Sequence, residues 1–399
     1  MTMVENKDKK VLNVPNLRFP EFEGEWEKCK LGDITQNFNR RNKEKIQYPM
    51  FSVTNERGFV PQSEQFEGRD MVGDDIKAYK IIQSQEFAYN PARINVGSIA
   101  MYSGKAPCMI SSLYVCFKTT QKVDDEWLMQ LLKTAKLNYC YNVNGEGGVR
   151  VYLFYPNFAR IRVSLPSLTE QKKIACFLNL LDERISTQNK IIEDLKKLKF
   201  AISKQVFAQE PNGWSRLDTL FSKGKAGGTP TSTNKEYYNG EIPFLSINDI
   251  TKQGKYVRYT ENHLSQSGLE NSSAWVVPKY SLIMSMYASV GLVTINEIPI
   301  TTSQAMFAMQ LKDKDLLDYL YYYLSYFKYR HIHKYLETGT QSNINADIVR
   351  GIMIPTYGHS RNMEIASTLQ GIDVKIDNEL SVLKLFNRQK NYLLSQMFI

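Results

Sequence analysis

The sequence predicts an α+β fold: two tandem globular domains separated by two long helices that pack as an antiparallel coiled coil, with a pseudo-two-fold internal repeat. Three observations predict it. The chain has 399 residues, which is too long for one ordinary hydrophobic core. It contains two long segments with the same spacing of apolar residues, and the stretches that precede these segments are related. Hydrophobic residues at 43% and charged residues at 23% are typical of a folded protein.

The two long segments, residues 165–207 and 354–398, soon become free of Gly and Pro except at Gly371. Their apolar residues recur in steps of four and three, which is the spacing of a helix that buries one face against a second helix. In the first segment this seam is formed by Ile174, Leu178, Leu181, Ile185, Ile192 and Leu195. In the second, at an offset of 191 residues, it is formed by Ile365, Leu369, Ile372, Ile376, Leu383 and Phe386. Polar residues interrupt the two series at the same steps, at Gln188 and Lys199 in the first and at Glu379 and Lys390 in the second.

The stretches before the two helices correspond more loosely, with Trp26 matching Trp214 and Val96-Gly97 matching Val290-Gly291. Short apolar and β-branched runs between turn residues predict strands in each half. The first helix delivers the chain to the second domain, so a second helix that buries its seam on the first must run back. We therefore expect a pseudo-dyad rod with a domain at each end. The predicted boundaries are 1–165 for domain one, 166–210 for the central helix, 211–354 for domain two and 355–399 for the last helix.

The charge and the cysteines restrict the class of protein. A net charge of +9 favours a polyanionic partner, and nucleic acid before a membrane surface. The five cysteines lie in the first half without a Cys-x-x-Cys pair, which indicates reduced, mostly buried thiols rather than disulfides or a metal site. Residues 1–10 lack the apolar stretch of a signal peptide, and no apolar run approaches the ~20 residues that span a bilayer. We expect a soluble, cytoplasmic protein without a membrane partner.

No catalytic motif is recognisable. A phosphate-binding loop is absent, because Ser103-Gly104-Lys105 is followed by Ala106. Residues 90–93 (NPAR) are the nearest match to a methyltransferase motif, but they lack its second proline and its aromatic residue. His331 and His333 lie two apart on a predicted helix, where they face different sides and cannot chelate a metal together. The sequence therefore predicts no catalytic residue and no metal ligand, and an enzyme with an unrecognised site stays as a rival.

Loops in both halves combine basic, hydroxyl and amide side chains, which neutralise phosphates and form hydrogen bonds with base edges. A pseudo-dyad protein also suits the dyadic backbone of a DNA duplex. Gly-rich stretches such as 227–228 would let backbone amides approach phosphate. The predicted DNA-binding residues are Arg40, Arg41, Lys43, Arg93, Lys105, Arg150, Lys225, Thr229, Ser289, Gln304, Gln341 and Asn343. The alternative is a non-enzymatic coiled-coil adaptor that binds nucleic acid only through its charge.

Four stretches carry a resemblance to a known family: residues 15–20 (PNLRFP), 165–172 (LPSLTEQK), 227–230 (GGTP) and 237–244 (YYNGEIPF). With them, the chain resembles the specificity subunits of type I restriction-modification enzymes over nearly its whole length. The resemblance implies a non-catalytic DNA-binding subunit with two target-recognition domains, each of which reads one half of a split site in double-stranded DNA. It also implies that the helices act as a spacer and bind methyltransferase subunits.

By the same resemblance, two methyltransferase subunits would bring S-adenosylmethionine and methylate adenine. An ATP- and Mg-dependent restriction and translocase subunit would join them for cleavage, and this chain would carry no cofactor. One departure is visible at the start of the second helix, where Glu170-Gln171 of the first helix has no counterpart. We therefore expect that helix to begin less regularly.

Overall fold

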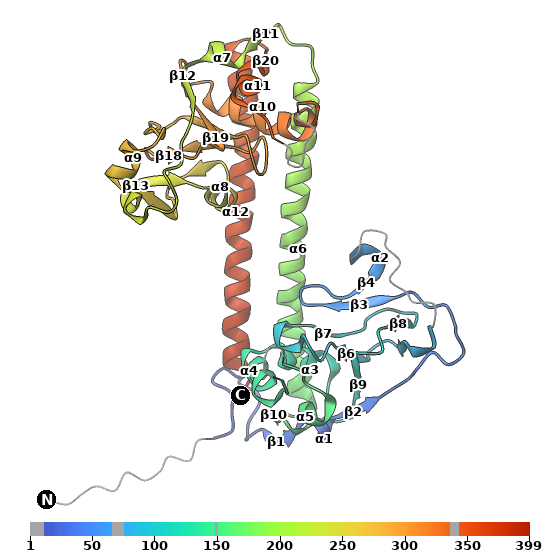
Figure 1. Cartoon of the computed structure of the whole chain (residues 1–399). Coiled ribbons are helices and arrows are strands. Elements are labelled where there is room, and N and C mark those ends of the chain that lie inside the picture. Colours follow the sequence, from blue (N-terminus) through green and yellow to red (C-terminus); the bar gives the residue numbers. More distant parts are fainter. Residues whose placement is uncertain (1–11, 66–75, 148–150, 336–342) are drawn as a thin grey trace, which may run out of the picture. The chain divides into compact units, whose positions relative to one another are not determined.

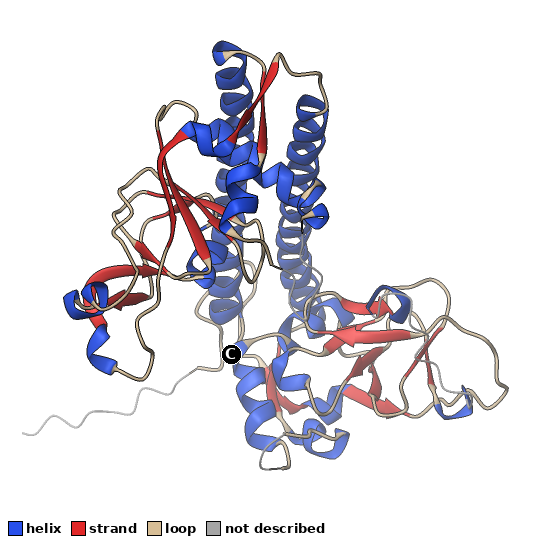
Figure 2. Cartoon of the chain, turned by 45° about the horizontal axis from the view of Figure 1, so that its top comes forward, coloured by secondary structure: helices blue, strands red, loops and turns tan. Residues whose placement is uncertain are grey.

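The computed structural model describes residues 12–65, 76–147, 151–335 and 343–399 (Figure 1). By its internal packing the chain forms two compact units. Unit 1 comprises Met1–Gln188 and Val382–Ile399, and unit 2 comprises Asn189–Ser381. Two long helices, α6 (Leu168–Phe207) and α12 (His359–Met397), each contribute one half to each unit. Figure 2 shows that strands and short helices accompany these helix halves in both units, so each unit is an α+β structure.

In unit 1 the central sheet has four antiparallel strands in the order β2-β9-β6-β7, and three two-stranded pairs surround it, β1-β10, β3-β4 and β5-β8. The strands are β1 (Glu27–Lys30), β2 (Thr35–Phe38), β3 (Phe51–Thr54), β4 (Gly58–Pro61), β5 (Lys80–Ile82), β6 (Phe87–Tyr89), β7 (Ile99–Met101), β8 (Cys108–Ile110), β9 (Val115–Thr119) and β10 (Arg162–Leu165). The helices are α1 (Leu31–Ile34), α2 (Gln62–Gln65), η1 (Ile76–Ala78), η2 (Ile94–Val96), α3 (Asp125–Leu132), α4 (Ala135–Asn144) and α5 (Tyr155–Arg160).

Alternation along β6 and β9 divides the interior of unit 1 into two cores, because successive side chains of a strand point to opposite faces of the sheet. Phe87, Tyr89 and Phe117 belong to the core that includes Trp127 of α3 and the two long helices. Ala88 and Cys116 belong to the smaller core on the other face. Since both faces are covered, β6 is buried along its whole length, and its sequence is a continuous apolar run.

Unit 2 has a five-stranded sheet in the order β12-β19-β16-β17-β14, a three-stranded sheet in the order β15-β13-β18, and the pair β11-β20. The strands are β11 (Gly213–Arg216), β12 (Phe221–Ala226), β13 (Tyr238–Leu245), β14 (Tyr256–Val257), β15 (Asn262–Leu264), β16 (Leu282–Ser285), β17 (Val293–Asn296), β18 (Thr301–Thr302), β19 (Met306–Leu311) and β20 (Met353–Thr356). The helices are α7 (Leu217–Leu220), η3 (Lys235–Tyr237), α8 (Ile247–Gln253), α9 (Gln266–Glu270), α10 (Leu317–Arg330), η4 (Ile332–Lys334) and α11 (Ala346–Gly351).

The two units share one plan, which confirms the predicted repeat. In each unit a strand near the start pairs antiparallel with the strand just before a long helix, β1 with β10 and β11 with β20. A shorter helix, α3 or α10, then packs on the end of a long helix. Trp127 lies 5.8 Å from Phe398 between ring centroids, and Tyr319 lies 6.1 Å from Phe207.

The long helices pair in antiparallel fashion inside each unit. In unit 1, α6 begins where α12 ends (Figure 1), and Ile174, Leu178 and Leu181 share a core with Leu393 and Met397. In unit 2, the end of α6 packs on the start of α12, where Ile365 and Leu369 lie in one core with Phe207. The other seam positions of the two series are buried or half-buried. A stripe of apolar residues at steps of three and four thus gives each helix its contact face.

Two of the polar residues that interrupt the seam, Lys199 and Lys390, form ion pairs between the helices. In unit 1 Lys390 of α12 forms an ion pair with Asp182 of α6, and in unit 2 Lys199 of α6 forms one with Asp373 of α12. A side chain from the shorter helix joins each pair. Gln130 Nε2 donates to Asp182 Oδ2 at 2.8 Å, and the Tyr322 hydroxyl donates to Asp373 Oδ2 at 2.8 Å. The same polar arrangement therefore recurs at the same step of both helices.

Candidate nucleic-acid interface

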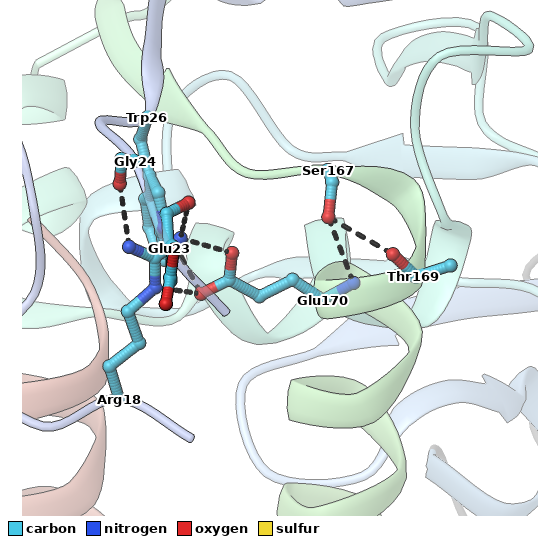
Figure 3. A network of polar contacts seen from close by, with 7 residues as sticks. All are labelled: Arg18, Glu23, Gly24, Trp26, Ser167, Thr169 and Glu170. Carbon is cyan, nitrogen blue, oxygen red and sulfur yellow. Dashed lines mark hydrogen bonds and ion pairs between the residues drawn. The ribbon is translucent and has the colours of Figure 1, made fainter. Parts of the chain in front are cut away.

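The start of α6 holds the amino-terminal segment of unit 1 through a buried carboxylate (Figure 3). The side chain of Glu170 is 1% exposed. It accepts hydrogen bonds from Arg18 Nε and Nη2, both at 2.8 Å, and from Trp26 Nε1 at 3.2 Å. The bonds to Glu170 raise the pKa of the Arg18 guanidinium above its ordinary value. A buried carboxylate is tolerated when charged donors saturate it in this way, so residues 165–172 have a structural role.

The neighbouring Gln171 has a counterpart at the start of α12, although the sequence there is different. Gln171 accepts from the backbone of Asp124 at 2.8 Å and donates to the backbone of Pro166 at 2.9 Å. Asn362, 191 residues later, accepts from the backbone of Tyr357 at 3.1 Å, and like Gln171 it is buried. Each amide ties its helix to the preceding stretch of chain, so α12 begins more regularly than its sequence suggested.

The Glu170 position, in contrast, is not maintained in unit 2. Arg361 takes its place and pairs with the exposed Glu364. The two tryptophans differ in exposure as well: Trp26, which donates to Glu170, is 4% exposed, whereas Trp214 is 54% exposed.

Several predicted DNA-binding side chains are engaged within their own unit. Arg40 forms paired hydrogen bonds with the Glu86 carboxylate, each at 2.8 Å, and this contact raises the pKa of Arg40. Thr229 donates its hydroxyl to the side chain of Gln304, so the structure brings these two predicted residues together. Lys225 Nζ donates to the backbone oxygen of Ser273 at 3.4 Å. Arg40 therefore stabilises its domain, and the other three shape one loop cluster.

The glycines of the 227–230 stretch serve close packing. A Cβ atom on Gly227 would lie 1.9 Å from Thr302 O, and one on Gly228 would lie 2.2 Å from Ser273 Oγ. Their amides donate to Met306 O at 3.1 Å and to Thr302 O at 2.9 Å. The expectation that these amides approach phosphate is wrong, because the backbone of the neighbouring turn already accepts both hydrogen bonds.

Four predicted basic residues are exposed, and their side chains form no hydrogen bond or ion pair with any described residue: Arg41, Lys43, Arg93 and Lys105. Ser289 is also exposed, on the β16–β17 loop, and Asn343 is half-buried. Arg150 and Gln341 lie outside the described residues. These four cations thus lie in three separate loops, which follow β2, β6 and β7.

Around one of these cations the structure forms a groove, which we call the unit 1 groove. Its volume is about 460 Å³, and it lies between the β3–β4 hairpin and the loop that joins β6 to β7. Its lining residues are Ser52, Val53, Thr54, Asn55, Glu56, Arg57, Val60, Asn90, Arg93, Ser98 and Tyr114. Arg93 was among the residues predicted from the sequence, and Asn55 and Arg57 were not. Residues 54–58 (TNERG) form a turn rich in polar groups, and this was the available signal.

The described residues contain no group of three or more His, Cys, Asp or Glu side chains placed to hold a metal ion. Within the same part of the chain, none of the helices combines the length and apolar character needed to cross a membrane.

Comparisons with known proteins agree with this architecture. The model of the type I restriction modification DNA specificity domain matches twice, over residues 23–197 and 211–383. A protein of Methanocaldococcus jannaschii described as the type I restriction enzyme MjaX specificity subunit is 24% identical, over 92% of this chain and 91% of that protein.

Two solved structures share the fold. The S subunit of a type I restriction-modification system from M. genitalium superposes with a TM-score of 0.58 and 13% identity, covering 97% of this chain and 99% of that one. A chain from a type I R-M system structure concerned with complex assembly has a TM-score of 0.60 and 16% identity, and the match covers 93% of this chain and 97% of that one. With the domain matched in both halves, the chain belongs to the family of type I restriction-modification DNA specificity proteins.

Proposed function

We propose that this chain selects a split site in double-stranded DNA, with one half-site read by each unit, for partner subunits that carry out the chemistry. The observation that carries the proposal is the repeated plan. Each unit has its own sheet, its own loops and an equivalent junction with the long helices. A duplicated scaffold with different loops suits two recognition tasks that differ in sequence.

The loops differ where the scaffolds agree. The β6–β7 loop of unit 1 and the β16–β17 loop of unit 2 each contain a glycine with positive φ, Gly97 at 98° and Gly291 at 78°. With these glycines aligned, Arg93 corresponds to Tyr287, and both side chains are exposed. An arginine and a tyrosine offer different hydrogen-bonding groups to a base edge. The two half-sites should therefore differ in sequence.

The partners in this proposal are two methyltransferase subunits and a restriction and translocase subunit. The methyltransferase subunits would supply S-adenosylmethionine and methylate adenine, and the third subunit would require ATP and Mg²⁺. This chain would contribute the choice of site and no cofactor.

The test is to sequence the methylated bases of cells that carry the gene and of cells from which it is deleted. We expect a split motif, two defined half-sites with an unspecified gap, that is present only with the gene. The absence of any gene-dependent motif would refute the proposal. An adaptor that binds DNA only through its charge would likewise give no gene-dependent motif.

A further inference from the structure

We propose that the unit 1 groove reads bases directly, with Arg93 contacting a guanine and Asn55 an adenine in the half-site of unit 1. This inference rests on the proposed function and names the residues that carry it out in one unit. Arginine forms paired hydrogen bonds with O6 and N7 of guanine, and asparagine forms them with N6 and N7 of adenine. Both pairings require a side chain whose polar groups are not already engaged.

Arg93 and Asn55 meet that requirement. Both are exposed on the rim of the groove, and neither side chain forms a hydrogen bond or ion pair with a described residue. The other two candidates on the rim do not meet it. Asn90 Oδ1 accepts from Ala92 N at 3.0 Å, and the Arg57 guanidinium pairs with Glu64 at 2.8 Å.

The backbone below Arg93 is held rigidly, as base discrimination requires. Arg93 N donates to Asn90 O at 3.0 Å, and Arg93 O accepts from Ser98 N at 3.1 Å. Asn90 N in turn donates to Ser98 O at 3.0 Å. The loop is therefore closed by three backbone hydrogen bonds, and the arginine side chain projects from a fixed turn.

Polar groups at the floor of the groove form hydrogen bonds with one another, so the free donors are those of the rim residues. Ser98 Oγ donates to Val53 O at 2.7 Å, and Val53 N donates to the Tyr114 hydroxyl at 3.2 Å. These bonds join β3 to the β6–β7 loop and to the turn before β9. They hold the two walls, which carry Asn55 and Arg93, at a constant separation.

Positive charge lies next to the groove, where a DNA backbone would need it. Asn55 also lines a second cavity of about 990 Å³ in unit 1, and Lys133 and Lys136 are among the other residues that line it. Both lysines are exposed. Two ammonium groups beside a rim of base-reading side chains fit a nucleic acid better than a neutral small molecule.

The experiment uses the complete chain in its complex, in cells and as purified protein. Arg93→Ala is compared with Arg41→Ala, which removes the same charge from an exposed site of the same unit outside the groove. For each variant we would sequence the methylated bases and measure binding to a duplex library with randomised half-sites. Arg93→Lys serves as a second variant, because it keeps the charge but lacks the planar guanidinium that forms two parallel hydrogen bonds.

We expect Arg93→Ala to lose the preference for guanine at one position of one half-site and Arg93→Lys to weaken it, while the other half-site and the gap stay unchanged. The expected loss of discrimination is about 5- to 140-fold, which corresponds to the ~1–3 kcal/mol of a paired base contact. Asn55→Ala should relax an adenine position in the same half-site. Arg41→Ala should weaken binding to all sequences alike.

An unchanged preference in the folded Arg93 variants would overturn the inference, as would a uniform weakening no different from that of Arg41→Ala. Failure of the proposed function gives another result, since the wild-type chain would then direct no split motif at all.

Discussion

At the scale of single residues, the carboxylate of Glu170 connects three parts of unit 1. It joins the amino-terminal segment, through Arg18, and the buried ring of Trp26 to the first turn of α6. Replacing it by alanine leaves a guanidinium and an indole N–H without their acceptor in a largely buried place. We expect Glu170→Ala to lower the free energy of unfolding by ~3 kcal/mol, measured by thermal or denaturant unfolding.

The control lies at the equivalent position of unit 2. Arg361 and Glu364 form an exposed pair, and exposed pairs contribute ~0–1 kcal/mol. Arg361→Ala should therefore change stability little. Equal effects of the two substitutions would show that burial of Glu170 does not matter.

The cysteines give a prediction that depends on pH. Cys108 and Cys116 are buried, and burial raises the pKa of each thiol to about 12. A raised thiol pKa keeps the group protonated, so at pH 8 only about one molecule in 10⁴ carries a thiolate there, and the thiolate is the reactive form. Cys176 is exposed. Iodoacetamide at pH 8, followed by peptide mass spectrometry, should label Cys176 in the folded protein and spare the two buried thiols until it unfolds.

At the scale of elements, the ion pairs between α6 and α12 can be tested by exchanging their charges. Lys390→Asp places two carboxylates together and should destabilise unit 1 by about 1–2 kcal/mol. Adding Asp182→Lys should restore most of that loss, because the amide of Gln130 can turn and offer its oxygen to the new lysine. Unfolding midpoints of the single and double variants provide the measurement.

In unit 2 the matching double variant, Lys199→Asp with Asp373→Lys, should recover a smaller part of the stability that Lys199→Asp loses. The Tyr322 hydroxyl donates to Asp373, and a lysine there cannot accept, which costs ~1 kcal/mol. Equal recovery in the two units would contradict the assigned hydrogen bonds.

Gly371 offers a stabilising substitution in α12. It is exposed inside the helix, and a Cβ atom there meets nothing within 4 Å. Gly371→Ala should raise the free energy of unfolding by about 0.5–1 kcal/mol, since glycine lowers helix stability by that amount. Gly227→Ala, whose Cβ would overlap Thr302 O, should lower it instead by ~1–3 kcal/mol. Loss of stability in Gly371→Ala would show that this position needs glycine for another reason.

The elements were predicted unequally well from the sequence, for a physical reason. The long helices follow from local periodicity, and the predicted segments 165–207 and 354–398 nearly coincide with α6 and α12. Contacts such as Arg40 with Glu86 depend on how distant strands meet, which local patterns do not encode. The partners of Lys199 and Lys390 were missed because each aspartate lies one position beyond a seam residue.

The candidate site was predictable only in part. Exposed arginines and lysines in loops could be named from composition and context. Which of them are engaged, and which lie around a groove, depends on the fold. Asn55 was not predicted because a single asparagine in a turn is ordinary, and it becomes a candidate only because it lines the same groove as Arg93.

At the scale of the whole molecule, the repeat gives the two long helices the same spacing between their ion-paired residues. Asp182 and Lys199 on α6 are 17 residues apart, and so are their partners Lys390 and Asp373 on α12. An insertion in one helix alone would put these two ion pairs out of register. Insertions at matching positions in both helices would keep them.

The decisive measurement is the methylation motif of a chain with four residues inserted in each helix, after Asn189 and after Leu380. Four residues add about 6 Å of helix and keep the steps of the seam close to phase. If the paired helices set the distance between two readers, the gap lengthens by about two base pairs at ~3.4 Å each, and both half-sites stay unchanged. A variant that still methylates with the original gap would contradict the role of the helices as a spacer.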